Sequence, residues 1–219
     1  MSNGFIGYNP DQAKRDLEKF YEAMKNIDLK YRNSVVMFVE KLRSHWGSPR
    51  AVEFSKTKFN VFPESFQFFQ NSTQNIIDSA VRAIQILAQN NGSYFDCNLI
   101  FKNEADEYDF HLEANVDLGN AILVGMDIPN VVFAIQDFEE DLSNVISMLN
   151  NLNCNLAVYD TTGDLVVAYQ TQIKNMVNNI YDLLSNIKSE LEFNIDIERQ
   201  NLDSAVKESA DLFGFNNNR

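Results

Sequence analysis

The stretch Trp46-Gly47-Ser48 separates two long helical patterns and decides how the first part of the chain folds. Upstream, apolar residues recur at steps of three and four, the spacing of one helix face: Ala13, Leu17, Phe20, Met24, Ile27, Tyr31, Val35, Phe38 and Leu42. Gly47 can adopt the positive φ that ends a helix, Ser48 can cap the next helix, and Pro49 suits its first turn. A facing stripe follows at Phe54, Phe62, Phe66, Phe69, Ile76, Ala80, Ile84 and Leu87. Residues 10–90 are therefore predicted to form an antiparallel helical hairpin.

This hairpin resembles the WXG family, the small helical-hairpin proteins exported by type VII secretion systems. The resemblance rests on Trp46, on Gly47 directly after it, and on Ala51 and Phe54 at the start of the second helix. In the family one residue separates Trp from Gly, whereas here the two are adjacent, and no Tyr after the hairpin has an acidic residue four positions later. The resemblance implies pairing through apolar helix faces, as a type VII export substrate or its partner. An unrelated helical hairpin closed by an aromatic residue and a glycine is the alternative.

The charge and hydropathy of the chain argue against two classes of partner. Of its 219 residues, 31 are acidic and 18 are Lys or Arg, which gives a net charge of −13. Residues 96–141 contain 12 acidic residues and one basic residue, so we expect this segment to repel nucleic-acid phosphates. No apolar run approaches the roughly 20 residues that cross a bilayer, and no basic region precedes an apolar core at the N-terminus. We therefore expect no nucleic-acid partner, no membrane association, and synthesis in the cytoplasm without a Sec signal.

Residues 91–130 break the helical pattern and predict a small acidic β insertion. Apolar and polar residues alternate over 95–101 and again over 108–118, which is the period of a strand with one buried face. The polar linker 102–107 has the length of a hairpin loop, so we expect a two-stranded antiparallel ribbon. Residues 121–128 can add a third strand before a turn at Pro129.

The helical spacing returns in residues 131–213. One apolar stripe contains Val132, Ile135, Phe138, Leu142, Val145, Leu149 and Leu152, and a second contains Leu165, Tyr169, Ile173, Met176, Ile180, Leu184, Ile187, Leu191 and Ile195. A turn-like stretch at 159–164 separates the two stripes, which predicts a second hairpin. The predicted fold is thus mainly α: two antiparallel helical hairpins forming a bundle, with a small antiparallel β insertion between them.

The sequence contains no catalytic set. The only histidines and cysteines are His45, His111, Cys97 and Cys154, and the cysteines form no CxxC motif. His45 is expected at the C-terminal end of a helix, where it can interact with the helix dipole. Asp109, His111 and Glu113 would share one strand face and could bind a cation, although a solvated strand face is favoured because no further ligand is evident. We expect no enzyme activity, no cofactor and no metal.

A cluster of phenylalanines is the candidate interaction surface. Phe59, Phe62, Phe66, Phe68 and Phe69 surround the second helix instead of forming one stripe, so a single partner helix cannot cover them all. Some must meet either the second hairpin or another protein chain. Pro63, inside this cluster, is expected to kink or interrupt the helix.

Together these features predict a non-enzymatic protein–protein interaction component, with Trp46, Gly47 and Ser48 as its turn motif. It would bind other chains, or copies of itself, through apolar helix faces. Export as a WXG-like type VII substrate or partner is the leading hypothesis. The alternative is a structural subunit incorporated in a larger particle, such as a phage virion or a contractile apparatus.

Overall fold

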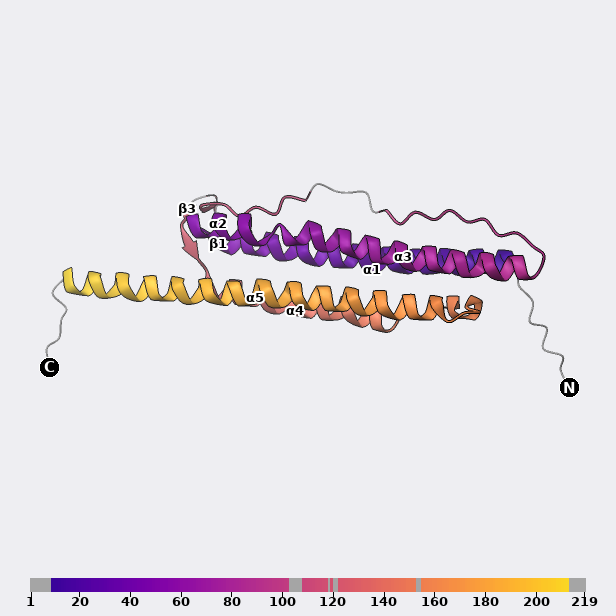
Figure 1. The fold of residues 1–219 in the computed structure, drawn as a ribbon. Coiled ribbons are helices and arrows are strands. Elements are labelled where there is room, and N and C mark those ends of the chain that lie inside the picture. Colours follow the sequence, from indigo (N-terminus) through magenta and orange to yellow (C-terminus); the bar gives the residue numbers. More distant parts are fainter. Residues whose placement is uncertain (1–8, 103–107, 118, 120–121, 153–154, 213–219) are drawn as a thin grey trace. The chain divides into compact units, whose positions relative to one another are not determined.

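The structure is a computed structural model that describes residues 9–102, 108–117, 119, 122–152 and 155–212. The protein is mainly helical, as predicted (Figure 1). Its elements are α1 (Pro10–His45), β1 (Trp46–Gly47), α2 (Pro49–Lys58), α3 (Val61–Asn90), β2 (Val116–Asp117), β3 (Ile122–Leu123), β4 (Gly125–Met126), α4 (Ile128–Asn150), the 3-10 helix η1 (Asn155–Tyr159) and α5 (Asp164–Leu212). None of the described helices contains an apolar stretch long enough to cross a bilayer.

The predicted second helix of the first hairpin is divided into α2 and α3. Phe59 is the C-cap residue of α2, and α3 begins two residues later. The interruption therefore lies before Pro63, which occupies the first turn of α3, where its missing N–H breaks no helical hydrogen bond. The predicted interruption is confirmed, and it falls just before the proline.

The contacts divide the chain into two compact units, and every long helix except α3 contributes to both. The first unit contains residues 1–35, 61–108 and 140–181, and the second contains residues 36–60, 109–139 and 182–219. This division differs from the predicted segments 10–90, 91–130 and 131–213, because α1, α4 and α5 each begin in one unit and end in the other.

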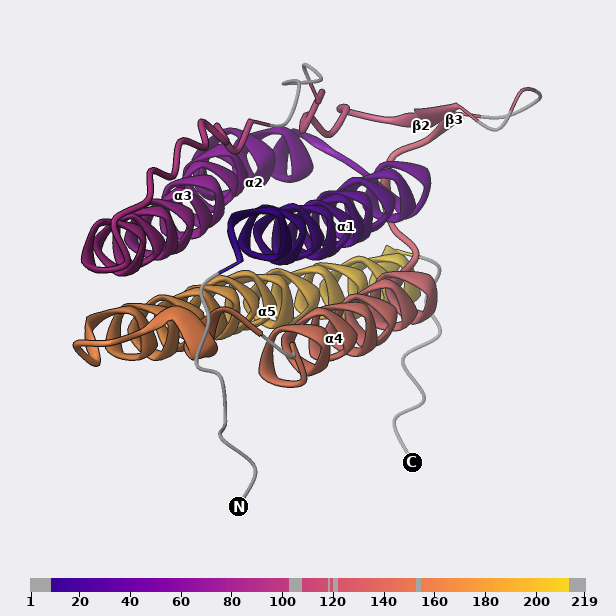
Figure 2. The ribbon, with the colours of Figure 1, turned by 90° about the vertical axis from the view of Figure 1, so that its right-hand side faces the viewer.

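In the first unit, the first part of α1 contacts each of the other helices (Figure 2). The Tyr31 ring packs edge-on against the Phe66 ring of α3 at 5.3 Å. The Phe20 ring lies 6.3 Å from the Tyr169 ring of α5. The ammonium of Lys30 lies 3.2 Å from a carboxylate oxygen of Asp141 on α4. The apolar stripe predicted for this part of α1 is buried, and Ala13, Leu17, Met24, Tyr31 and Val35 have no exposed surface.

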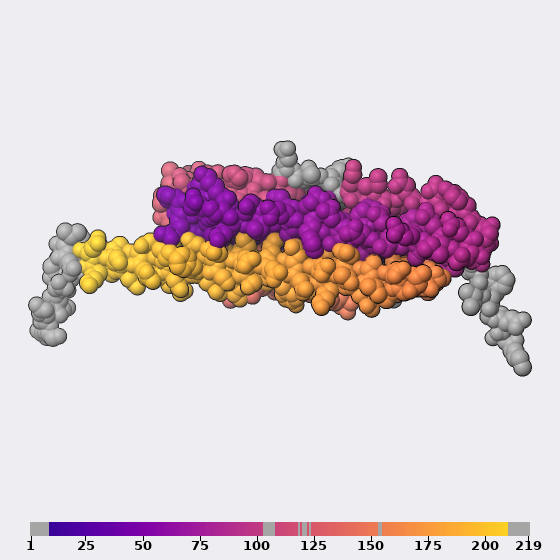
Figure 3. Space-filling view, viewed as in Figure 1, coloured from indigo at the N-terminus to yellow at the C-terminus, as the bar shows by residue number. Residues whose placement is uncertain are grey.

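Side chains of α3 and the first part of α5 also meet directly (Figure 3). The Ser65 hydroxyl donates a hydrogen bond to the Asn179 side-chain oxygen and is itself hydrogen-bonded to the Tyr31 hydroxyl at 2.6 Å. Tyr31, Ser65 and Asn179 therefore connect α1, α3 and α5 within the first unit.

In the second unit, the end of α1 packs against the start of α4, and α2 and α4 contact α5. The rings of Phe38 and Phe138 stack at 4.1 Å, which joins α1 to α4. Ion pairs also join helices of this unit: Lys41 with Asp137 at 2.7 Å, Lys58 with Glu190 at 2.6 Å, and Lys188 with Glu139 at 2.7 Å. These exposed pairs orient the helices more than they stabilise them.

The β insertion differs from its prediction. Residues 95–101 and 108–113 contain no strand, and the pairs that form are β2 with β3 and β1 with β4, both antiparallel. A ribbon between 95–101 and 108–118 is therefore wrong, whereas the predicted third strand, within 121–128, contains β3 and β4. Most of the predicted linker, 103–107, lies outside the described residues.

The alternation that suggested the ribbon is nevertheless real. Phe95, Phe101, Phe110 and Leu112 are buried, while Asp96, Asp109, His111 and Glu113 are exposed. Residues 95–101 lie in the first unit and form hydrogen bonds with the Gln74 side-chain amide of α3. That amide accepts from Phe101 N–H at 2.6 Å and donates to Leu99 C=O at 3.1 Å. A side chain thus takes the place of a neighbouring strand.

Candidate functional site

The Trp46-Gly47-Ser48 turn forms the corner between α1 and α2. Trp46 and Gly47 form β1, and Ser48 then caps α2: its backbone is extended (φ −164°, ψ 164°) and its hydroxyl accepts from Ala51 N–H at 3.1 Å. The Trp46 side chain is fully buried, with its ring 5.2 Å from the Phe54 ring. Its indole N–H has no partner among the described residues. Trp46 therefore contributes to the corner through apolar packing.

Gly47 is needed for a reason that the sequence did not suggest. Its φ is not positive, so the expected left-handed helix end is wrong. Instead, the backbone of residues 115–116 crosses directly over it. A Cβ on Gly47 would lie 2.5 Å from Val116 N and 2.6 Å from Asn115 Cα. Only glycine fits under this crossing.

Backbone hydrogen bonds fix both sides of the corner to the insertion. On one side, Ser48 N–H donates to Glu113 C=O at 3.2 Å. On the other, β1 pairs with β4, and Asp127 N–H donates to His45 C=O at 2.8 Å. His45 is the last residue of α1, at the helix C-terminus as predicted, and its Nδ1 lies 3.8 Å from the Asp127 carboxylate. The turn motif is thus held between two segments of the insertion.

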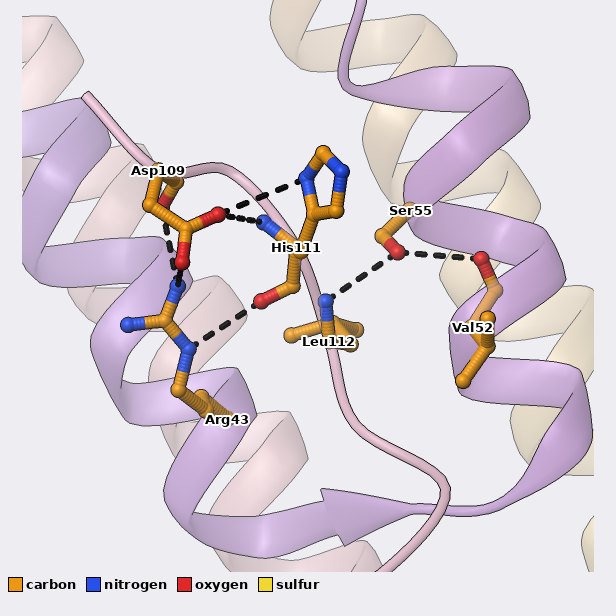
Figure 4. Close-up of polar contacts among 6 residues, drawn as sticks. All are labelled: Arg43, Val52, Ser55, Asp109, His111 and Leu112. Atoms are coloured by element: carbon orange, nitrogen blue, oxygen red, sulfur yellow. Dashed lines mark hydrogen bonds and ion pairs between the residues drawn. The ribbon is translucent and has the colours of Figure 1, made fainter. Parts of the chain in front are cut away.

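Residues 109–113, which we call the strap, are held by side chains of α1 and α2 (Figure 4). Arg43 donates to two strap carbonyls, that of Asp109 at 2.8 Å and that of His111 at 3.0 Å. On the opposite side, Leu112 N–H donates to the Ser55 hydroxyl at 3.1 Å. The Leu112 side chain is buried, whereas the His111 ring points away into solvent. Arg43 and Ser55 therefore replace the strand that the sequence predicted beside these residues.

Two of the three possible cation ligands, Asp109 and His111, form ion-pair contacts. Asp109 pairs with Arg43 at 3.4 Å, and its other carboxylate oxygen lies 3.4 Å from His111 Nδ1. Asp109, His111 and Glu113 are all exposed. Within the part of the chain that the structure describes, no cluster of three or more His, Cys, Asp or Glu side chains could hold a metal ion.

The phenylalanine cluster is mostly internal. Phe59, Phe62, Phe66 and Phe69 are buried, and Phe68 is 37% exposed. Phe59 packs edge-on against Phe54 in the second unit, and Phe66 packs against Tyr31 in the first. Of the five residues proposed as an interaction surface, Phe68 is therefore the one accessible to another chain.

A buried polar cluster in the first unit escaped the sequence analysis. Asp28 and Arg32 form an ion pair at 2.9 Å inside the unit, and the Arg32 guanidinium lies 4.5 Å above the Phe66 ring. Burial raises the pKa of Asp28, although Arg32 acts in the opposite direction. Burial also raises the pKa of Tyr31 well above its usual range. The sequence does indicate this ion pair, because Asp28 and Arg32 are spaced i, i+4 beside the apolar positions Ile27 and Tyr31.

In the described residues, the corner is held together by apolar packing and by backbone and side-chain hydrogen bonds. Comparison of the chain with protein-family models, with curated proteins and with solved structures finds no match.

Proposed function

We propose that this protein is a non-enzymatic interaction component that binds other protein chains through apolar helix faces. The observation that carries the proposal is a set of large apolar side chains left exposed on helices of the second unit. Phe133 on α4 and Phe193, Leu202 and Val206 on α5 are each 61% exposed. Covering such side chains with a partner is favourable by roughly 1–2 kcal/mol each, because part of each residue is already covered.

In its finer form, the proposal is that the helices form two antiparallel hairpins, the first of which is WXG-like. The corner supports this because it joins α1 to α2 through a buried Trp46 followed by Gly47, the residues on which the resemblance rests. By the same resemblance we propose a role as a type VII export substrate or as the partner of one.

Native mass spectrometry of the chain, purified gently from cells that make it, tests the binding role. We expect a complex of defined stoichiometry. Replacing Phe133 and Phe193 together by Ser should release the chain from it without changing the circular dichroism spectrum. Replacing Gln136 and Gln200 by Ser is the matched control, because these exposed residues lie on the same two helices. A chain that is monomeric throughout, or a complex indifferent to both phenylalanines, would contradict the proposal.

The secretion role needs a separate experiment. The chain should accumulate in the medium of a host with an active type VII system and stay inside a host whose export ATPase is inactivated. Equal retention in both hosts would refute the secretion role and leave the binding role standing. Recovery only in a sedimenting particle would favour the structural-subunit alternative.

A further inference from the structure

The chain leaves α3 through a Schellman cap. Gly92 has a positive φ of 65°, the left-handed conformation that commonly ends a helix. Ser93 N–H donates to Ala88 C=O at 2.9 Å, and Gly92 N–H donates to Gln89 C=O at 3.0 Å. These are the two backbone hydrogen bonds of the Schellman motif, so Asn91 is the C-cap residue of α3.

This cap exposes an asparagine that is followed by a glycine. Asn91 and Gly92 are both exposed, and among the described residues only the chain neighbours of Gly92 have atoms within 4 Å of the place where its Cβ would lie. An asparagine side chain can react with the backbone nitrogen of the next residue, and glycine favours this because it has no side chain to obstruct the approach. The other Asn-Gly pair of the sequence, Asn3-Gly4, lies outside the described residues.

We propose that Asn91 is a site of spontaneous deamidation and that the cap of α3 controls its rate. Base from the solvent removes the amide proton of Gly92, and the nitrogen attacks the side-chain carbonyl carbon of Asn91. A carbon–nitrogen bond forms, the bond to Nδ2 breaks, and Nδ2 leaves as ammonia with the proton that the backbone nitrogen lost. Water then opens the cyclic imide at either of its two carbonyls, which leaves aspartate or isoaspartate. The proposal is independent of the interaction role.

The folded cap holds both reacting nitrogens away from this path. The Gly92 N–H that must lose its proton is bonded to Gln89 C=O, and Asn91 Nδ2 donates to Leu87 C=O at 2.7 Å. The attack therefore requires the end of α3 to fray until both hydrogen bonds are broken. Helix ends open at low free energy, and two hydrogen bonds of ordinary strength reduce the open fraction on the order of 10-fold. We expect deamidation to be slower in the folded chain by about this factor.

The product cannot rebuild the cap. Aspartate at this position has no N–H to donate to Leu87 C=O, and its charge lies beside the negative end of the helix dipole. Isoaspartate adds a carbon to the backbone, which shifts the two N–H donors of the cap away from their acceptors. Ala88 and Phe95, on either side of the cap, are buried. Deamidation should therefore loosen the last turn of α3 and the start of the segment that follows it.

Peptide mapping by mass spectrometry tests the site. The full chain is incubated at mildly alkaline pH, one sample folded and one unfolded in urea. We expect aspartate and isoaspartate to replace Asn91 in both samples, more slowly in the folded one. Asn151 is the internal control, because it is exposed just after α4 but precedes Leu152 instead of a glycine. An Asn91 that persists in the unfolded chain, or that reacts no faster there than Asn151, overturns the proposal.

Two variants test the control by the cap without changing the Asn-Gly pair. Ser93→Pro removes the N–H that donates to Ala88 C=O, whereas Ser93→Ala, the matched control, keeps it. With both variants shown to be folded by circular dichroism, we expect Asn91 to react several-fold faster in Ser93→Pro than in Ser93→Ala. Equal rates in the two folded variants would refute the role of the cap. So would equal rates in the folded and the unfolded wild-type chain, a comparison that needs no variant to fold.

Discussion

Gly47→Ala should destabilise the protein more than any other glycine-to-alanine change among the described glycines. The new Cβ would lie 2.5 Å from Val116 N and 2.6 Å from Asn115 Cα, well inside van der Waals contact. Both atoms belong to the backbone, so no flexible side chain can move aside. Overpacking typically costs 1–3 kcal/mol, and we place this change at the upper end, about 3 kcal/mol. For a chain of this size that corresponds to a fall in Tm of roughly 6–12 °C.

The assay is urea unfolding followed by circular dichroism, with Gly163→Ala as the control. Gly163 has a positive φ of 87° but open space around its missing Cβ, so alanine there should cost only the left-handed backbone strain, roughly 1–2 kcal/mol. If Gly47→Ala lowers the free energy of unfolding no more than Gly163→Ala does, the backbone of residues 115–116 can move away from the new Cβ. That result would refute the steric explanation of the corner. A lower midpoint with an unchanged slope would show that stability falls without a change in the surface exposed on unfolding.

Four further substitutions test the buried groups of the two units. Trp46→Ala should lower the free energy of unfolding by about 3–5 kcal/mol, because a fully buried indole is removed; a loss below about 1 kcal/mol in the same urea assay would show that Trp46 does not organise the corner. Leu112→Asp should unfold the strap, whereas His111→Asp should be nearly neutral, and equal sensitivity in thermal melts would contradict the opposite orientations of these neighbours. Burial raises the pKa of Asp28, so the folded state holds its proton more tightly than the unfolded state. The resulting stability is present below the unfolded pKa of 3.8 and is lost as the pH rises through the higher folded pKa. Between pH 4 and 7 the stability of Asp28→Asn relative to wild type should therefore increase with pH, and a flat or falling difference would contradict this.

The sequence was sufficient for the helices because their apolar stripes repeat over many turns and local spacing determines which face is buried. It also predicted which residues of the strap are buried, since alternation does not depend on what lies beside the backbone. It could not predict the hydrogen-bond partners. The amide of Gln74, the hydroxyl of Ser55 and the guanidinium of Arg43 replace a strand, and no period in the sequence distinguishes such side chains from ordinary exposed polar residues.

The corner was predicted in position but not in mechanism. A glycine after a helix most often adopts the left-handed conformation that ends the helix. The residues next to Gly47 in the sequence do not indicate that residues 115–116 cross over it. The phenylalanine cluster shows the same limit. Helical spacing revealed that one neighbour could not cover all five rings, but only the packing showed that Phe59 and Phe66 belong to different units.

The pairing of β1 with β4 has a consequence for the order in which the chain can fold as it is made. Trp46 and its ladder partner Met126 are separated by about 80 residues. Bacterial-to-eukaryotic translation rates of about 5–20 residues per second place roughly 4–16 seconds between their syntheses. Throughout that interval α1 can form, because its hydrogen bonds are local, but the corner has no β4 edge, and until residues 115–116 are made it also lacks the crossing backbone. A nascent chain stalled before residue 113 would therefore present β1 as an unpaired strand edge, a feature through which chains aggregate.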